Sequence, residues 1–200
     1  MAAFQVGVSP DFYVDARGRF EAELESLLTG PGIEWGPMPQ LPGLVATPES
    51  LDRFDGVFAL GLRITQESVR GVERLALVAR WGVGYDKIDV SALTEAGIAL
   101  SITPDAVRTP VAEAILTLIL ALAKNLLAQD RTARAGKWRG DLPAMGKNLR
   151  GRILGSVGFG NIAREMFRLA APFGFARMLA YDPYGSAEAA GALGVELTGL

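Results

Sequence analysis

Residues 149–184 read LRGRILGSVGFGNIAREMFRLAAPFGFARMLAYDPY, and the rest of the chain is organised around this stretch. An apolar run leads into Gly158-Phe159-Gly160, a helical pattern follows, and a second apolar run ends at Asp182. This order predicts a strand, a glycine turn, a helix that begins near Asn161, a second strand and an acidic residue. Such an order is typical of a dinucleotide-binding site.

The glycine turn suits the phosphates of a dinucleotide. Gly158 permits a tight turn, and Gly160 lets its backbone approach a pyrophosphate closely. The unpaired N–H groups at the start of the helix, at Asn161 and Ile162, would face the phosphates. Glycine is common here, 24 of 200 residues, so an ordinary strand–helix–strand unit without a ligand stays open as the alternative.

The acidic residue points to one of the two nicotinamide cofactors. Asp182 follows Gly158 by 24 residues, close to the offset of about 20 residues expected for the acid that bonds a ribose 2′-OH. A carboxylate at this place would repel a 2′-phosphate. The sequence therefore predicts NAD rather than NADP as the cofactor.

Composition excludes several classes of function. The 200 residues carry 20 basic and 22 acidic side chains without a basic stripe, which argues against nucleic acid and anionic membranes as partners. Cysteine and histidine are both absent, so this sequence holds no disulfide, no imidazole base and no histidine metal site. We predict no metal. The first residues lack the pattern of a signal peptide, which predicts a cytoplasmic location.

Short apolar runs alternate with helical patterns before the glycine turn. The runs cover residues 4–8, 33–35, 57–60, 75–79 and 98–102, and helices are expected at 17–28, 65–69 and 90–96. Alternation of this kind predicts an α/β fold with a parallel sheet and helices on its faces. After Asp182 the pattern predicts a helix over 186–192 and a strand over 195–197, which completes only the first half of a dinucleotide domain.

Residues 109–134 are expected to form the longest helix. Thr109 is a plausible N-cap and Pro110 suits the first helical position. From 111 to 123 only Glu113 and Thr117 are polar, so the helix is apolar nearly all round. The run is too short to span a membrane. We therefore predict that it is buried against a neighbouring domain or a second subunit.

Three segments together resemble the D-isomer-specific 2-hydroxyacid dehydrogenase family, which includes phosphoglycerate dehydrogenase and the glyoxylate/hydroxypyruvate reductases. They are RWGVGYDKID at 80–89, the long helix with its flanks at 103–138, and residues 149–184. The resemblance implies an NAD-dependent oxidoreductase that interconverts 2-hydroxy and 2-keto acids. It also implies a parallel-sheet substrate domain over 1–104, followed by the first half of a Rossmann-type NAD-binding domain over 105–200, and a homodimer.

The resemblance also assigns substrate-binding residues. Backbone N–H groups of Val83 and Gly84 would hold the substrate carboxylate, which fits the anion-binding capacity of exposed backbone donors. Arg63 would grip a second carboxylate or a phosphate, although a lone arginine is as readily explained as a solvated side chain. Which 2-hydroxy acid is bound, and the direction of the reaction, stay open.

Two departures from the family pattern limit this prediction. Asn161 replaces an arginine that is often found there. The family's catalytic arginine, acid and histidine follow the motif that ends at Asp182, whereas this sequence ends about eighteen residues later. We therefore expect no catalytic residue within these 200 residues, and no turnover by them alone. The alternative is a non-catalytic remnant that binds nucleotide or acts in subunit association. A hydrolase or transferase is disfavoured, since neither G-x-S-x-G nor GxxxxGK[ST] is present.

Overall fold

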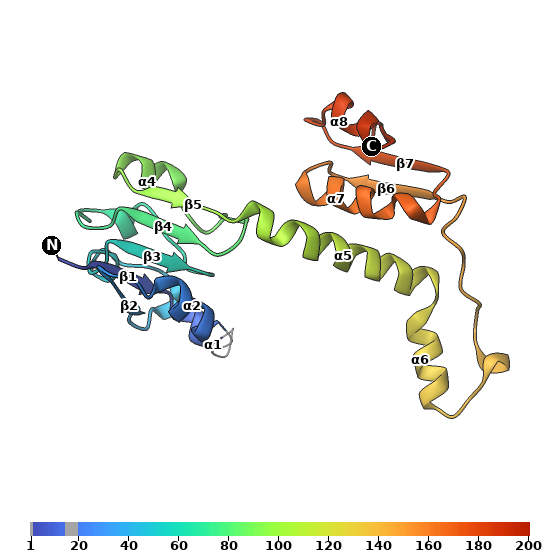
Figure 1. Ribbon diagram of the computed structural model, residues 1–200, viewed down its shortest axis with the longest axis horizontal. Helices are drawn as coiled ribbons and strands as arrows, with labels where there is room; N and C mark the ends of the chain where they lie inside the picture. The colour runs from blue at the N-terminus through green and yellow to red at the C-terminus, as the bar shows by residue number, and fades with distance from the viewer. Residues whose placement is uncertain (1, 15–19) are drawn as a thin grey trace. The chain divides into compact units, whose positions relative to one another are not determined.

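The computed structural model describes residues 2–14 and 20–200. The chain divides into two compact units, Met1–Pro104 and Asp105–Leu200, and each is built on a parallel sheet (Figure 1). Parallel strands joined through helices are the architecture expected from the alternation of apolar runs and helical patterns.

The first unit contains a five-stranded sheet with the order β2-β1-β3-β4-β5. Its strands were expected from short apolar runs. The ends of β1 are those expected, and the ends of the other strands shift by no more than two residues, as is usual for strand boundaries. The strands are β1 (Phe4–Val8), β2 (Ile33–Pro37), β3 (Gly56–Ala59), β4 (Leu77–Arg80) and β5 (Ala99–Ser101).

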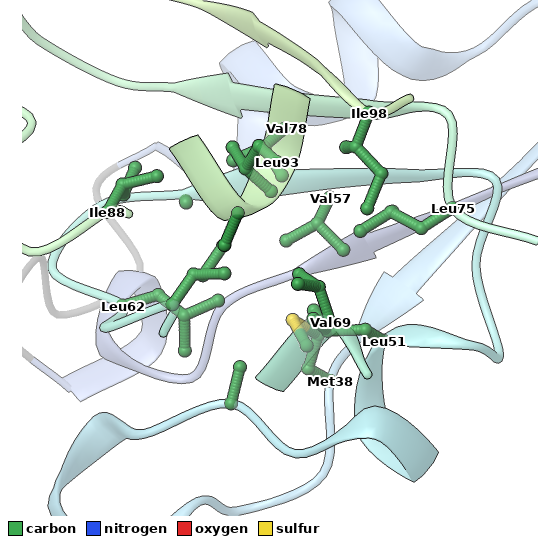
Figure 2. Packing of buried hydrophobic residues seen from close by; sticks show 14 residues of the cluster. Met38, Leu51, Val57, Leu62, Val69, Leu75, Val78, Ile88, Leu93 and Ile98 are labelled. Atoms are coloured by element: carbon green, nitrogen blue, oxygen red, sulfur yellow. The ribbon is translucent and has the colours of Figure 1, made fainter. Parts of the chain in front are cut away.

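Helices cover both faces of this sheet because neighbouring strand residues point to opposite faces. Val57 and Ala59 of β3 belong to one buried cluster, whereas Phe58 packs against the other. Figure 2 shows the first cluster, in which Val57 and Val78 lie among side chains from the surrounding helices and loops. The helices of this unit are α1 (Asp11–Val14), α2 (Glu21–Leu28), η1 (Pro42–Leu44), α3 (Pro48–Leu51), η2 (Glu67–Val69) and α4 (Val90–Glu95).

The helix expected over residues 17–28 is described only in part. Residues 17–19 lie outside the described residues, and α2 accounts for the remainder from Glu21 onward. The short helix expected over 65–69 is the 3₁₀ turn η2, and the one expected over 90–96 is α4, with Asp89 as its N-cap.

The second unit contains a three-stranded sheet with the order β6-β7-β8. Ala112 and Leu116 of the long helix α5 are buried with Met166, Phe167 and other apolar residues of the unit in one cluster. The other elements are α6 (Leu126–Arg134), η3 (Arg139–Asp141), β6 (Ile153–Val157), α7 (Asn161–Ala170), η4 (Ala171–Phe173), β7 (Arg177–Tyr181), α8 (Ala187–Ala192) and β8 (Val195–Leu197).

The prediction for the long helix is wrong in three respects. Helix α5 spans Pro104–Ala123, so it begins five residues before Thr109 and holds Pro110 inside it. A second helix, α6, follows Asn125, whose left-handed φ of 55° ends the helical geometry of α5. Only Ala112 and Leu116 of α5 are buried within this chain, and burial of the helix against a second subunit stays a prediction. Third, the apolar run was expected to be too short for a membrane, whereas α5 is long and apolar enough to cross one, a test that core helices also pass.

Candidate functional site

The glycine turn connects β6 to α7 at the carboxyl end of the second sheet. Gly158 has a φ of +103°, a conformation that favours glycine over residues with a side chain. Its N–H donates to the carbonyl of Tyr181 at 2.7 Å, and its own carbonyl accepts from the Ser156 hydroxyl at 2.9 Å. The turn is thereby fixed to both strands that flank it, and the Ser156 hydroxyl has the partner that a polar group in this strand requires.

Asp182 is directly bonded to this turn. Its Oδ2 accepts the N–H of Phe159 at 2.7 Å, and its Oδ1 accepts the N–H of Tyr184 at 2.9 Å. These two backbone donors, Phe159 first, hold the pKa of the Asp182 carboxyl below its usual range. The carboxylate is therefore ionised at neutral pH and lies beside the glycines, although 24 residues separate it from Gly158.

The space around the turn fits a pyrophosphate. A Cβ placed on Gly158 or on Gly160 would meet no heavy atom within 4 Å, so the backbone is open to an approaching ligand. Helix α7 begins at Asn161, and no side chain caps its N-terminus. Its first N–H groups, including that of Ile162, are the usual donors to a phosphate at such a position. The residues present therefore fit NAD.

A second glycine loop follows β4 in the first unit. Arg80 Nε donates to the Gly84 carbonyl at 2.8 Å, and its Nη1 also donates to the Trp81 carbonyl. Gly82 has a φ of +132°, and its N–H donates to the Thr103 hydroxyl at 2.9 Å. The Arg80 side chain thus holds the loop in place through hydrogen bonds to two of its carbonyl groups.

The predicted substrate residues are only partly brought together. Gly84 lines a cavity of about 150 Å³ with residues that follow β3 and β4, among them Gly61 and Lys87. Val83 lies in the same loop but does not line this cavity. Arg63 is also absent from its lining, because its backbone is bonded to Leu44 and Ala46 and its side chain is exposed.

Sequence reasoning missed two residues at this edge of the sheet. Lys87 Nζ donates to the Gly61 carbonyl at 3.3 Å. Asp11 is 3% exposed and accepts hydrogen bonds from the Gly61 N–H and the Ser9 hydroxyl, both at 2.5 Å. Ser9 and Asp11 come directly after β1, and the carboxyl ends of parallel strands are where binding residues gather. Their place after the strand was the signal available in the sequence.

We predict that Asp11→Ala lowers the free energy of unfolding by about 2–3 kcal/mol, because the buried Ser9 hydroxyl and the half-buried Gly61 N–H both lose their acceptor. Urea unfolding followed by tryptophan fluorescence measures the change. Glu73→Ala, an exposed position in the same unit, is the matched control and should shift stability by less than about 0.5 kcal/mol. Equal unfolding midpoints for the two variants would contradict the structural role of Asp11.

Comparison with known proteins places these features in a family. Residues 116–200 match the NAD binding domain of the D-isomer specific 2-hydroxyacid dehydrogenases. A D-3-phosphoglycerate dehydrogenase of Methanocaldococcus jannaschii is 38% identical over 138 residues, which make up 68% of this chain and 26% of that protein. A hydroxypyruvate reductase of Thermotoga maritima is 37% identical over 121 residues, or 60% of this chain and 39% of that protein.

The chain belongs to the D-isomer-specific 2-hydroxyacid dehydrogenase family. The predicted family, the α/β fold class and NAD as the cofactor of the second unit are thereby confirmed. In length, this family member spans well under half of the two curated relatives just described.

Solved structures agree with the dehydrogenase fold. A glyoxylate reductase from Paecilomyes thermophila is 26% identical with a TM-score of 0.75, and the match covers 99% of this chain and 61% of that one. An NAD-dependent formate dehydrogenase from Staphylococcus aureus, solved in complex with NAD, is 19% identical with a TM-score of 0.73, covering 98% and 60%. At that identity the second match shows the shared fold alone.

Proposed function

We propose that this chain supplies the substrate-binding unit, residues 1–104, and the first part of the NAD-binding unit, residues 105–200, of an oxidoreductase. The reaction is the interconversion of a 2-hydroxy acid and a 2-keto acid. The observation that carries the proposal is the hydrogen bond from the Phe159 N–H to the Asp182 carboxylate, 2.7 Å long. It joins the phosphate-binding turn to the ribose-binding acid in one half-site.

In this half-site the chain binds and orients the cofactor. NAD, when bound, supplies the hydride acceptor or, as NADH, the donor. The backbone of Gly158 and Gly160 and the first N–H groups of α7, at Asn161 and Ile162, hold the pyrophosphate. Asp182 accepts a hydrogen bond from the ribose 2′-OH. The side-chain amide of Asn161 carries no charge, so the backbone donors and the helix dipole bind the pyrophosphate.

The substrate carboxylate binds to the loop after β4, at the backbone N–H groups of Val83 and Gly84. Lys87, which lines the same cavity as Gly84, adds a positive charge at this position. Arg63 reaches only a substrate that extends beyond this cavity and carries a second anionic group. Because Arg63 lies outside this cavity, we expect small 2-keto and 2-hydroxy acids with one anionic group to be the preferred substrates.

Hydride transfer also needs a proton donor for the alkoxide that develops on the substrate. These 200 residues contain no histidine, and the ionisable side chains that line the substrate cavity, among them Tyr85, Asp86 and Lys87, do not include the imidazole that the family resemblance implies. The acid–base group and the orienting cation therefore come from outside this sequence. The chain by itself is expected to bind NADH without turning over a keto acid.

A fluorescence titration of the chain with NADH tests the proposal. We expect a saturable increase in NADH emission and no NADH oxidation when glyoxylate or hydroxypyruvate is added. Absence of binding at millimolar NADH would refute the half-site, and oxidation of NADH would refute the statement that the acid–base group lies elsewhere.

We further propose that the long helix mediates association with a second copy of the chain, as expected for a homodimer. Val111, Leu118 and Leu122 repeat at spacings of seven and four, which places them on one face of α5. Leu118 and Leu122 are 63% and 78% exposed. A row of exposed leucines on a helix is unfavourable in water and favours a protein partner. This surface is also what the alternative, a non-catalytic association module, would use.

Replacing both Leu118 and Leu122 by glutamate is expected to weaken self-association at least tenfold, because each buried leucine contributes about 1.5–3 kcal/mol. Sedimentation velocity over a range of concentrations measures the effect. Thr117→Glu is the matched control, since Thr117 is exposed on another face of the same helix. A wild-type chain that stays monomeric, or equal weakening by the control, would contradict the interface.

A further inference from the structure

A basic cavity lies on the surface of the second unit, between α7 and the first turns of α5. Its volume is about 250 Å³. Three arginines face it, one from α5 and two from α7, and it lies outside the residues assigned above to substrate binding. The lining residues are Arg108, Asn161, Arg164, Glu165, Arg168 and Leu193.

The charge of this cavity is not neutralised by its own acid. Glu165 is its one carboxylate, 12% exposed, and it is already bonded to Arg168 at 2.7 and 3.0 Å and to the Thr109 hydroxyl at 3.2 Å. The Arg168 guanidinium, first among several causes, lowers the pKa of Glu165, so this carboxylate is ionised. Asp105 outside the lining also pairs with Arg108 at 3.1 Å, so three guanidinium groups against two carboxylates leave one uncompensated positive charge at the cavity.

Arg108 carries the observation that points to a ligand. Among buried side-chain nitrogens and oxygens of residues 2–14 and 20–200, its Nε is the one without a hydrogen-bond partner. The nearest acid to its guanidinium is Asp105, which lies 3.1 Å from Nη1 and is 80% exposed. A buried donor without an acceptor is unfavourable. The Arg108 side chain as a whole is 43% exposed, so a small shift of the guanidinium would let an anion in the cavity accept from it.

We propose that this cavity binds a small phosphate-bearing anion, held by Arg108 from α5 and by Arg164 and Arg168 from α7. A phosphate compensates the remaining positive charge and can share the donors of the two guanidinium groups that are paired with carboxylates. Its tetrahedral oxygens can accept from guanidinium groups that approach from two helices, whereas a planar carboxylate offers fewer directions. The volume is below the roughly 300–1,000 Å³ of sites for drug-sized ligands, which suits free phosphate or the phosphate end of a small ester.

The site is distinct from the proposed cofactor half-site. Gly158, Gly160 and Asp182 do not line this cavity. Asn161 borders both, and its side-chain oxygen accepts from Arg164 Nη2. The inference therefore stands whether or not the chain binds NAD.

Titration of the chain with inorganic phosphate at constant ionic strength, followed by NMR of the arginine Nε–H groups, tests the proposal. We expect saturable shifts at Arg108 and Arg168 with a midpoint in the millimolar range. Arg108→Gln should weaken binding at least tenfold. Glu165→Gln should tighten it several-fold, because the competing carboxylate is removed while a hydrogen-bonding group is kept. A parallel titration with glycerol 3-phosphate identifies the kind of ligand. Tighter binding of glycerol 3-phosphate than of inorganic phosphate would indicate a phosphate ester, and equal affinities would indicate free phosphate.

Control variants keep the test decisive. Arg134→Gln removes the same charge at an exposed pair with Asp130 on α6, and phosphate binding should be unchanged. If the Arg108 variant does not fold, Arg164→Gln removes one guanidinium charge of the cavity from α7 instead and should weaken phosphate binding in the same way. Equal weakening by Arg134→Gln, absence of saturation, or shifts confined to the Gly158 and Gly160 amides would each overturn the site.

Discussion

Replacing Gly160 by valine is expected to abolish NADH binding, with the dissociation constant raised at least a hundredfold, while the fold stays intact. Gly160 has φ −73° and ψ −171°, extended angles that valine adopts readily. A Cβ at this position meets no heavy atom within 4 Å. The valine methyl groups would instead fill the space through which a pyrophosphate approaches the backbone. NADH fluorescence titration measures binding, and circular dichroism measures the thermal midpoint.

Two further glycines serve as comparisons. Gly140→Val changes a glycine in η3 that also has open space around its Cβ position, and it should change neither binding nor stability. Gly158→Val should reduce both, because a φ of +103° is strained for any residue with a side chain. If Gly160→Val bound NADH within threefold of the wild type, the cofactor would not lie against this turn.

The second unit shows what local pattern can predict. Strands β6 and β7, the turn at Gly158 and the start of α7 at Asn161 all follow from features that lie within a few residues of one another. Apolar runs of five residues and a glycine that needs positive φ are strong local determinants. The proximity of Asp182 to the turn also follows, since adjacent parallel strands end at the same edge of a sheet.

The long helix shows where local pattern fails. Thr109 and Pro110 are favourable residues for a helix start, yet α5 begins at Pro104. Pro104 itself suits a first helical position, and Pro110, six residues later, lies inside the helix. Two start signals therefore compete, and the helix uses the earlier one although a proline is best tolerated in the first turn. Burial of α5 against a second subunit stays a prediction.

Residues joined only by the tertiary fold were not predictable. Asp11 reaches Gly61 across 50 positions, and Arg108 meets the arginines of α7 more than 50 positions later. Neither pair has a sequence spacing with chemical meaning. Arg63 stays a prediction: a cation close to a strand end was expected at the substrate, and its side chain is exposed outside the cavity lined by Gly84.

Asp182→Ala is expected to reverse the cofactor preference of the half-site. The dissociation constant for NADH should rise about tenfold to a hundredfold, because a charge-assisted hydrogen bond to the ribose is lost. NADPH should lose less affinity or gain some, because the carboxylate that repels its 2′-phosphate is gone. Since Asp182 also bonds the N–H groups of Phe159 and Tyr184, the variant also loosens the turn, an effect that disfavours the binding of both cofactors equally. The ratio of the two constants removes that shared effect.

Parallel titrations with NADH and NADPH measure this ratio, and Asp141→Ala is the control. Asp141 likewise accepts a backbone N–H, that of Trp138 at 3.0 Å, in an exposed turn, so its loss should leave the ratio unchanged. An unchanged ratio of the NADH and NADPH dissociation constants in Asp182→Ala would mean that the carboxylate stabilises the turn but does not bind the ribose.

The acid limb of NAD⁺ binding provides an independent check on Asp182. Its pKa is depressed in the folded chain, mainly by the Phe159 N–H. NAD⁺ binds the folded chain with this carboxylate ionised, so its contribution to affinity is lost only as pH falls through the folded-state pKa, which lies below the ordinary value of about 3.9. Calorimetric titration with NAD⁺ should give constant affinity from about pH 7 to 5 and a decline only below about pH 3.9. Asp182→Asn should bind weakly at all pH values and show a shallower decline, because the group that titrates has been removed. An equally steep decline in that variant would assign the acid limb to other carboxylates with lowered pKa values, such as Asp55.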